Sequence, residues 1–128
     1  MIIGDSIELL KLDKFKAGDK LWACEFKMKL GKEKLRFGSK PIRGILSTSR
    51  QEDVHNKNMS DPYGHKYIEY FIPFKKDGNL DWKKAVELSS RQYATTEEDC
   101  IKLYNSFVNK HIKWLEEQLI KTKEQLIK

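Results

Sequence analysis

The spacing of apolar residues changes once along this chain, near residue 95. Before that point apolar positions mostly alternate with polar ones, as in strands that bury one face. After it they recur at three- and four-residue steps, as on one side of a helix. The change coincides with Thr95-Thr96-Glu97-Glu98-Asp99, a Thr-x-x-Glu capping box with acids where a helix dipole is positive. No proline or glycine follows, so the pattern predicts one helix over residues 95–128.

The clearest strand signal covers residues 21–30. One set of positions is apolar and the set between them is mostly polar: Trp22, Cys24, Phe26, Met28 and Leu30 alternate with Ala23, Glu25, Lys27 and Lys29. This period of two predicts an antiparallel strand with one buried face and one wet face. Gly31-Lys32-Glu33 then turns the chain, and Leu35 and Phe37 resume the alternation, which indicates a hairpin.

Further strands are expected over residues 42–48, 67–74 and 85–89. Pro41 cannot donate to a ladder and therefore precedes the first of these. Residues 75–79 form a turn after the second, and residues 90–94 link the third to the helix. Residues 49–65 are polar and are interpreted as a long exposed loop. Residues 5–17 fit either a strand or a short helix.

The helix carries two apolar stripes. The first contains Cys100, Leu103, Tyr104, Phe107, His111, Trp114 and Gln118. The second contains Ile101, Asn105, Val108, Ile112, Leu115, Leu119, Thr122 and Leu126. The first half of the helix should therefore lie against the sheet. Near its end Glu-Gln-Leu-Ile-Lys occurs twice, at 117–121 and 124–128, a heptad step that suggests a helix–helix seam.

A helix of this length spans roughly 50 Å, whereas a domain of this size is roughly 35 Å across. The end must meet another chain, bend back or fray, and we expect the first: a homodimer or higher homo-oligomer through the helix. The expected fold is α+β, a small antiparallel sheet or partly open barrel followed by one long C-terminal helix. It forms a single domain over residues 1–128, with a β-rich core over residues 1–94.

The net charge of the chain adds a modest preference for one class of ligand. Lys and Arg total 25 against 19 Asp and Glu, a formal net charge of +6 without a basic tail. Anionic ligands are therefore favoured over cationic ones, and the four arginines are the best candidates for bidentate contacts with phosphate or carboxylate. No apolar run approaches the roughly 18 residues of a membrane span. We expect a soluble protein of the cytoplasm.

Catalytic and metal-binding patterns are missing from the sequence. His55, His65 and His111 show no metal-ligand spacing, and His111 is expected to be a packed or interface side chain. Cys24 and Cys100 fit buried free thiols. The serines have no nucleophile elbow and the glycines form no phosphate loop. We therefore expect a protein that is not an enzyme and holds no cofactor and no metal.

Two segments have residues suited to ligand binding. Residues 89–96 place Arg91, Tyr93 and several hydroxyls before a helix N-terminus, where an anion could be held. The acids Glu97, Glu98 and Asp99 oppose this reading, and the alternative is a capped turn with Tyr93 in the core. Residues 40–44 bring Arg43 next to Gly44, a residue that permits close approach of a ligand or another backbone. The strand aromatics Trp22, Phe26, Phe37, Tyr67, Tyr70 and Phe71 could stack on bases, but core packing fits each of them better.

Three segments of the sequence are considered together: residues 39–44, the aromatic strand ending at Lys76-Asp77-Gly78, and residues 89–98 running on to Tyr104-Asn105. In these segments the chain resembles small accessory proteins encoded by phages of low-GC Gram-positive bacteria. The similarity covers roughly residues 20–115. Among such proteins the layout of a small sheet, a long carboxy-terminal helix and an oligomer is similar to the Thoeris anti-defence sponges. That resemblance implies binding of cyclic ADP-ribose signals without cleavage, and it implies no site residues for this chain.

The leading hypothesis is a phage-type anti-defence protein that sequesters a small nucleotide immune signal in a pocket between sheet and helix, at a dimer interface. Arg43 and Arg91 would hold phosphates, Tyr93 would stack on a base and Asn105 would donate a hydrogen bond. The alternative is a protein-binding inhibitor of a bacterial defence or host enzyme, which would use a sheet edge or residues 49–65. A nonspecific nucleic-acid binder ranks third, because the net charge is modest and unclustered.

Overall fold

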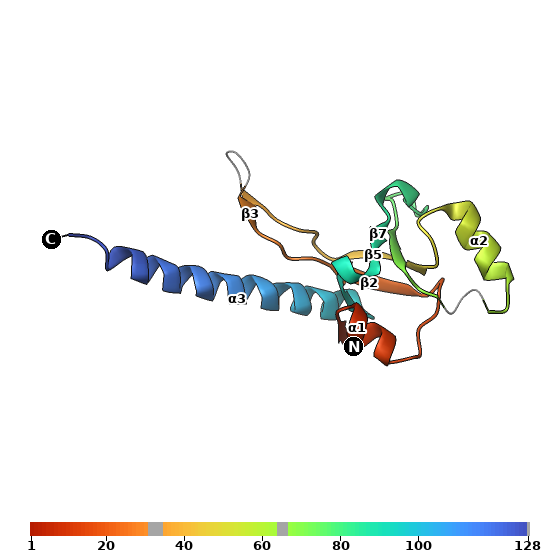
Figure 1. The fold of residues 1–128 in the computed structure, drawn as a ribbon, viewed down its shortest axis with the longest axis horizontal. Coiled ribbons are helices and arrows are strands. Elements are labelled where there is room, and N and C mark those ends of the chain that lie inside the picture. Colours follow the sequence, from red (N-terminus) through yellow and green to blue (C-terminus); the bar gives the residue numbers. More distant parts are fainter. Residues whose placement is uncertain (31–34, 64–66, 128) are drawn as a thin grey trace.

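A computed structural model describes residues 1–30, 35–63 and 67–127 (Figure 1). It contains a six-stranded antiparallel open sheet and a long C-terminal helix, which confirms the predicted α+β class. The six strands, in chain order, are β1 (Ile2–Gly4), β2 (Lys20–Cys24), β5 (Ile42–Ser47), β6 (Tyr70–Pro73), β7 (Val86–Glu87) and β8 (Gln92–Ala94). In space they lie in the order β1-β8-β2-β5-β6-β7.

The predicted hairpin is present as β3 (Lys29–Leu30) and β4 (Leu35–Arg36), which pair separately from the large sheet. The expected turn at residues 31–33 lies outside the described residues. The expected single strand over residues 21–30 is wrong, because β2 ends at Cys24 and β3 begins at Lys29. After β2 the chain stays in contact with the neighbouring segment: the Glu25 N–H donates a 2.7 Å hydrogen bond to the Ser39 carbonyl, and the rings of Phe26 and Phe37 stack at a centroid distance of 6.0 Å.

Both faces of β2 are covered, which the alternating pattern did not predict. Leu21 and Ala23 belong to a core cluster that includes Leu9, Phe71 and Tyr93. Cys24 belongs to a second cluster, formed with Ala94, Cys100 and Leu103, against which Trp22 also packs. Ala23 was expected on the wet face and is instead fully buried. Alanine is small and not polar, so the alternating pattern could not show that this second face of the strand is also covered.

The open question over residues 5–17 resolves to a short helix, α1 (Ser6–Lys11), preceded by β1. The Asp5 side chain accepts a 3.0 Å hydrogen bond from the Glu8 N–H and so caps this helix. Leu9 is the one buried residue of α1 and joins the larger core cluster. α1 therefore covers the sheet face opposite to the long helix.

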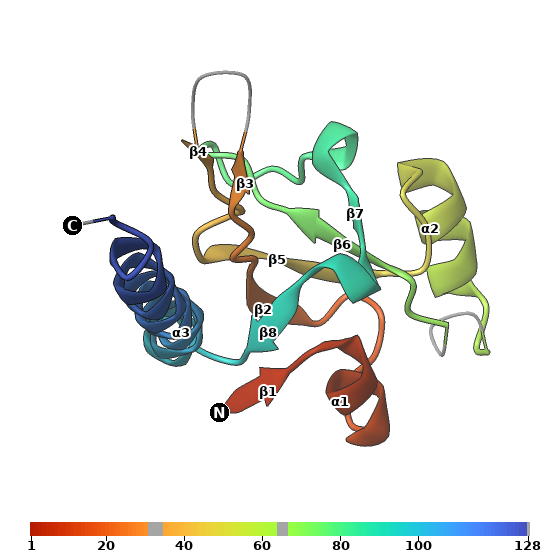
Figure 2. The same cartoon turned by 60° about the vertical axis from the view of Figure 1, so that its left-hand side comes forward.

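The polar stretch predicted as a loop is also partly helical. α2 spans Glu52–Ser60 and lies beside the sheet on the side away from the long helix (Figure 2). Only His55 of α2 is buried, so the sequence shows no apolar period there. Residues 64–66 of that stretch lie outside the described residues.

The C-terminal part of the sheet differs from the expected strands in length and number. The strand expected over residues 67–74 is the shorter β6, and the one over residues 85–89 is reduced to β7 between two 3-10 helices, Trp82–Lys84 and Leu88–Ser90. Residues 90–94 were expected to be a link, yet they contain β8. This strand pairs with both β1 and β2 and so lies inside the sheet. Three residues are too few to show a period of two.

The long helix α3 spans Glu97–Lys123 and ends earlier than predicted. The Thr96 side chain caps it by accepting a 3.2 Å hydrogen bond from the Asp99 N–H. Its first turns pack on the sheet through Cys100 and Leu103, as predicted. His111 packs between the rings of Phe26 and Trp114, at centroid distances of 5.6 Å each. Beyond that point the helix projects away from the rest of the molecule (Figure 1).

Candidate ligand-binding site

An ion pair between Arg91 and Glu25 lies where β2 and β8 end beside each other. The two strands pair up to Cys24 and Gln92, which places the next residue of one strand opposite the preceding residue of the other. Nη1 of Arg91 donates to Oε2 of Glu25, and also to the Ser90 carbonyl at 3.0 Å. The side chains are only 18% and 17% exposed. Lys27 Nζ lies 3.5 Å from the other carboxylate oxygen of Glu25, so this acid faces two cations.

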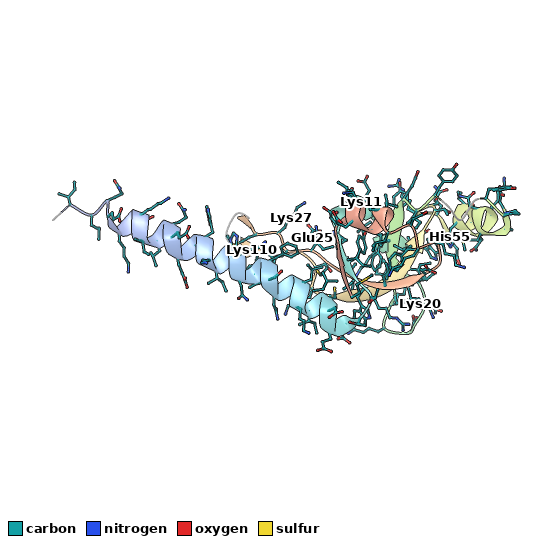
Figure 3. The ribbon with its side chains drawn as sticks, turned by 90° about the horizontal axis from the view of Figure 1, so that it is seen from below. Lys11, Lys20, Glu25, Lys27, His55 and Lys110 are labelled. Carbon is teal, nitrogen blue, oxygen red and sulfur yellow. The ribbon has the colours of Figure 1, made fainter. Side chains whose placement is uncertain are left out.

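The first cavity beside this ion pair, called the aromatic cavity below, measures about 200 Å³. It opens between the end of the sheet and α3, and Phe26 and Phe107 supply its apolar walls. Its polar groups come from Glu25, Lys27, Ser89, Ser90 and Gln92. Figure 3 shows Glu25 and Lys27 near Lys110, at the place where α3 leaves the globular part. The 5.6 Å contact of Phe26 with His111 independently places this segment against α3.

The second cavity, called the basic cavity, also measures about 200 Å³. Arg91 and Lys84 line it together with the Ser39 side chain. Its remaining walls are apolar and come from Ile42, Phe71, Pro73 and Val86. Arg91 lines this cavity and its partners Glu25 and Ser90 line the aromatic cavity, so the ion pair connects the linings of the two.

A third, more open cavity of about 350 Å³ lies between α1 and the β6–β7 edge. Leu10, Ile68 and Leu88 give it an apolar floor, and Glu69 and Glu87 give it acidic groups. Its charge is therefore opposite to that of the basic cavity.

The structure does not gather the four predicted ligand residues into one site. Arg91 lines the basic cavity, whereas Arg43 and Asn105 line none of the three cavities described above. Arg43 is exposed on β5, with its guanidinium carbon 5.7 Å from the centre of the Phe74 ring. Asn105 is exposed on α3.

Tyr93 is a core residue. Its side chain is completely buried, with the hydroxyl donating to the Leu88 carbonyl at 2.7 Å and the ring edge-on to Phe71. Burial raises the pKa of this hydroxyl well above its usual value. A ring without an exposed face cannot stack on a ligand, so the stacking role expected for Tyr93 does not fit this fold. The alternative of a capped turn with Tyr93 in the core does.

The helix N-terminus itself is unsuited to an anion. Thr96 caps it, and Glu97, Glu98 and Asp99 occupy its first turn. These carboxylates already supply the negative charge that the helix dipole favours. The anion expected in front of α3 therefore has no vacant place there.

Gly44 allows a neighbouring strand to approach closely. A Cβ at this position would lie 2.3 Å from the Ile72 carbonyl oxygen and 2.5 Å from Cζ of Phe71. Of the two uses foreseen for this glycine, the close approach is therefore to another backbone, that of β6, which pairs with β5 at this point.

The strand aromatics are divided between core and surface. Phe71 is buried, and Trp22, Phe26 and Tyr70 are half-buried. Phe37 and Tyr67 were expected in the core and are exposed, because β4 and the segment before β6 leave the large sheet. Of these rings, only Phe26 and Phe71 line the cavities beside Arg91.

One polar cluster was not foreseen. His55 of α2 is buried, and its Nδ1 lies 2.9 Å from the Ser47 hydroxyl and accepts from the Thr48 N–H at 3.3 Å. Asn58 Nδ2 also donates to the Thr48 hydroxyl at 3.1 Å, so these bonds attach α2 to the end of β5. Burial lowers the pKa of His55. Ser47 is completely buried, which leaves this serine–histidine contact a structural one.

The cysteines are buried and free, as predicted. The Cys24 thiol lies 4.0 Å from the Cys100 carbonyl oxygen. The hydrogen bond with the Cys24 thiol, followed by burial, raises the pKa of Cys100 well above its usual value. A thiol held in its protonated form is a poor nucleophile.

Within residues 1–30, 35–63 and 67–127 no group of three or more His, Cys, Asp or Glu side chains is placed to hold a metal ion. No helix in this part of the chain is long and apolar enough to span a bilayer. Comparison of the chain with family models, with curated proteins and with solved structures found no match in any of the three.

Proposed function

We propose that this protein binds a small anionic ligand of nucleotide type and holds it without catalysis. The observation that carries the proposal is the position of Arg91, which lines the basic cavity and is paired with Glu25 of the aromatic cavity. One side offers phenylalanine rings and the Gln92 amide, which suit a base. The other offers Lys84 and the remaining Arg91 N–H groups, which suit a phosphate or carboxylate.

Cavity size supports a ligand that uses both sides. Each cavity is smaller than the roughly 300–1,000 Å³ of typical small-molecule sites, whereas the two together reach the lower part of that range. A ligand spanning them must cross the Glu25–Arg91 ion pair. We infer that its anionic group replaces the Glu25 carboxylate as the partner of Arg91, so Glu25 acts as an internal competitor.

The absence of catalysis is inferred from the groups at hand. Among the described residues, Glu25 is the one carboxylate lining the two cavities, and it is engaged by Arg91 and Lys27. The Ser90 hydroxyl donates to the Glu87 carbonyl at 2.7 Å, and neither His55 nor His111, the two histidines that the structure describes, lines either cavity to activate it. These groups hold a ligand but offer no base to a nucleophile.

The resemblance to phage accessory proteins narrows the ligand class. We propose a nucleotide immune signal of the cyclic ADP-ribose type, so that the protein sequesters the signal and acts against host defence. Net charge and site composition are compatible with this class, and the sponge layout motivates its choice.

Thermal unfolding against a panel of cyclic nucleotides and ADP-ribose derivatives, at matched ionic strength, tests the proposal. A ligand present at a thousand times its Kd stabilises the native state by about 4 kcal/mol. Lys84→Gln should weaken binding of the hit about tenfold, and Lys83→Gln, its neighbour outside the cavity, should leave it unchanged. A flat panel, or equal effects of the two lysine variants, would contradict the site.

Glu25→Gln gives the sharper test because its expected effect has the opposite sign. Removing the competing carboxylate should tighten binding of the anionic ligand while lowering the unfolding temperature of the free protein, since Arg91 loses its partner. Isothermal titration calorimetry measures the first effect and calorimetric unfolding the second. Weaker binding by Glu25→Gln would show that Glu25 contacts the ligand directly.

A second candidate is a protein-binding inhibitor of a bacterial defence or host enzyme. The open cavity beside α1 favours it, since Leu10 is 53% exposed there next to Glu69 and Glu87. This surface suits a basic segment with an apolar side chain. Glu87→Lys should abolish recovery of such a partner from host lysate and leave nucleotide binding intact. Binding of any nucleic acid that falls steeply with salt would instead indicate the third hypothesis.

A further inference from the structure

The projecting half of α3 leaves an apolar stripe in water. Beyond Phe107 the helix continues for roughly four turns. Its described apolar residues there are largely exposed, with Leu115 at 41%, Ile112 at 46% and Leu119 at 54%. An isolated helix of this length is marginal in water, so packing against another surface is needed to hold it.

The stripe has a defined spacing. Ile101, Asn105, Val108, Ile112, Leu115, Leu119 and Thr122 follow one another at alternating four- and three-residue steps. These residues are called the α3 stripe below. They lie beside, rather than on, the face with which Cys100, Leu103 and Phe107 pack on the sheet. The step pattern is the heptad repeat of a coiled-coil seam, in which a second helix with the same repeat fits.

We propose that a second copy of this chain covers the α3 stripe, and that the two α3 helices run parallel about a two-fold axis. Asn105 is the one amide of the stripe and occupies the a position of the heptad. In a parallel homodimer it faces Asn105 of the second copy, where two amides satisfy each other and fix the register. Ile112 at a and Leu115 at d is the combination that favours two parallel strands.

The charges flanking the stripe agree with this arrangement. One flank consists of uncharged residues and a histidine, namely Tyr104, His111, Gln118 and Gln125. The other flank contains Lys102, Asn109, Glu116 and Lys123. In a parallel pair each flank faces the opposite flank of the second copy, and the contacts are Tyr104 with Asn109, His111 with Glu116 and Gln118 with Lys123. No like charges meet.

The inference is independent of the ligand, so its test needs none. Sedimentation equilibrium of the intact chain should give twice the chain mass of 15.1 kDa. Leu119→Asp should convert the protein to a monomer with an unchanged circular dichroism spectrum of the sheet. Ile120→Asp, at a neighbouring and equally exposed position outside the stripe, should remain dimeric. A monomeric wild type, or a dimeric Leu119→Asp, would overturn the proposal.

Orientation is tested by one added thiol. Thr122→Cys places two cysteines across the seam of a parallel dimer, so oxidised glutathione should cross-link the chains through a disulfide, and the two thiol hydrogens pass to the glutathione, which leaves as two reduced molecules. Lys121→Cys, one residue off the stripe, should cross-link far less. A Thr122→Cys protein that stays dimeric but is not cross-linked would overturn the parallel arrangement. The native thiols, Cys24 and Cys100, are buried and do not compete.

Discussion

What a single side chain can bind in this molecule depends on a few close neighbours. Glu25, Arg91 and His55 are three examples. The sequence indicated no partner for Arg91, but the fold places Glu25 beside it. Glu25 therefore neutralises the side chain that is best suited to bind an anionic ligand. His55 looked like one more polar residue of a loop, but Ser47 and Thr48 hold it inside the protein. In both cases contacts formed only by the fold decide the chemistry, across 66 residues for Arg91 and Glu25 and across 7 or 8 residues for His55.

Acidification should destabilise the protein through His55. Burial lowers its folded-state pKa below the unfolded value near 6.5, so the unfolded chain takes up a proton first as the pH falls. The stabilisation is fully present above about pH 7 and is lost as the pH drops toward the folded pKa, by about 1.4 kcal/mol for each unit of difference. Protonation of Nδ1 would also oppose the Thr48 N–H that now donates to it.

Urea unfolding of the wild type and of His55→Gln between pH 7.5 and 5.5 measures this effect. The variant should start less stable and lose less stability over the same interval. Parallel curves for the two proteins would show that another group controls the acid response.

At the scale of elements, close contact between β5 and β6 depends on Gly44. Gly44→Ala should destabilise the protein by about 2–3 kcal/mol, because the added methyl meets the Ile72 carbonyl oxygen, a backbone atom that cannot rotate away. Gly78→Ala is the matched control. No atom of the described residues lies within 4 Å of its Cβ position, so only its positive φ of 88° opposes the change, at a cost of about 1 kcal/mol. Chemical denaturation of both variants decides the comparison, and an equal loss would contradict the packing argument.

The elements that were predicted from the sequence are those in which the pattern of apolar and polar residues extends over enough positions to be recognised. α3, the core of β2 and the strands β5 and β6 follow from periodicity and from capping or turn residues. β8 has three residues and α2 has one buried residue, so neither shows a period. Of the residues at the candidate site, only Arg91 was predicted from the sequence. Glu25, Lys84 and the phenylalanines lie elsewhere in the chain, and the sheet topology brings them close to it. For Tyr93 the sequence left two roles open, stacking on a ligand and packing in the core, and its complete burial fits the second.

At the scale of the molecule, the globular part and the projecting end of α3 are separable. The residues of the two core clusters, and those packed against them, end at Phe107. A chain truncated after Trp114 should therefore keep its sheet and unfold cooperatively, but as a monomer. Its unfolding temperature should no longer rise with protein concentration, as that of a dimer does. Circular dichroism melts at several concentrations measure this, and a truncated chain without a cooperative transition would contradict the separation.

The position of β8 also bears on how the protein is made. This strand is the last of the sheet to leave the ribosome, yet it lies between β1, the first, and β2. Until residues 92–94 emerge, β1 has no neighbour and the apolar side chains around Leu21 and Phe71 lack Tyr93 to cover them. The sheet therefore cannot close until residues 92–94 have been synthesised. During that time its exposed strands are the natural target of a chaperone.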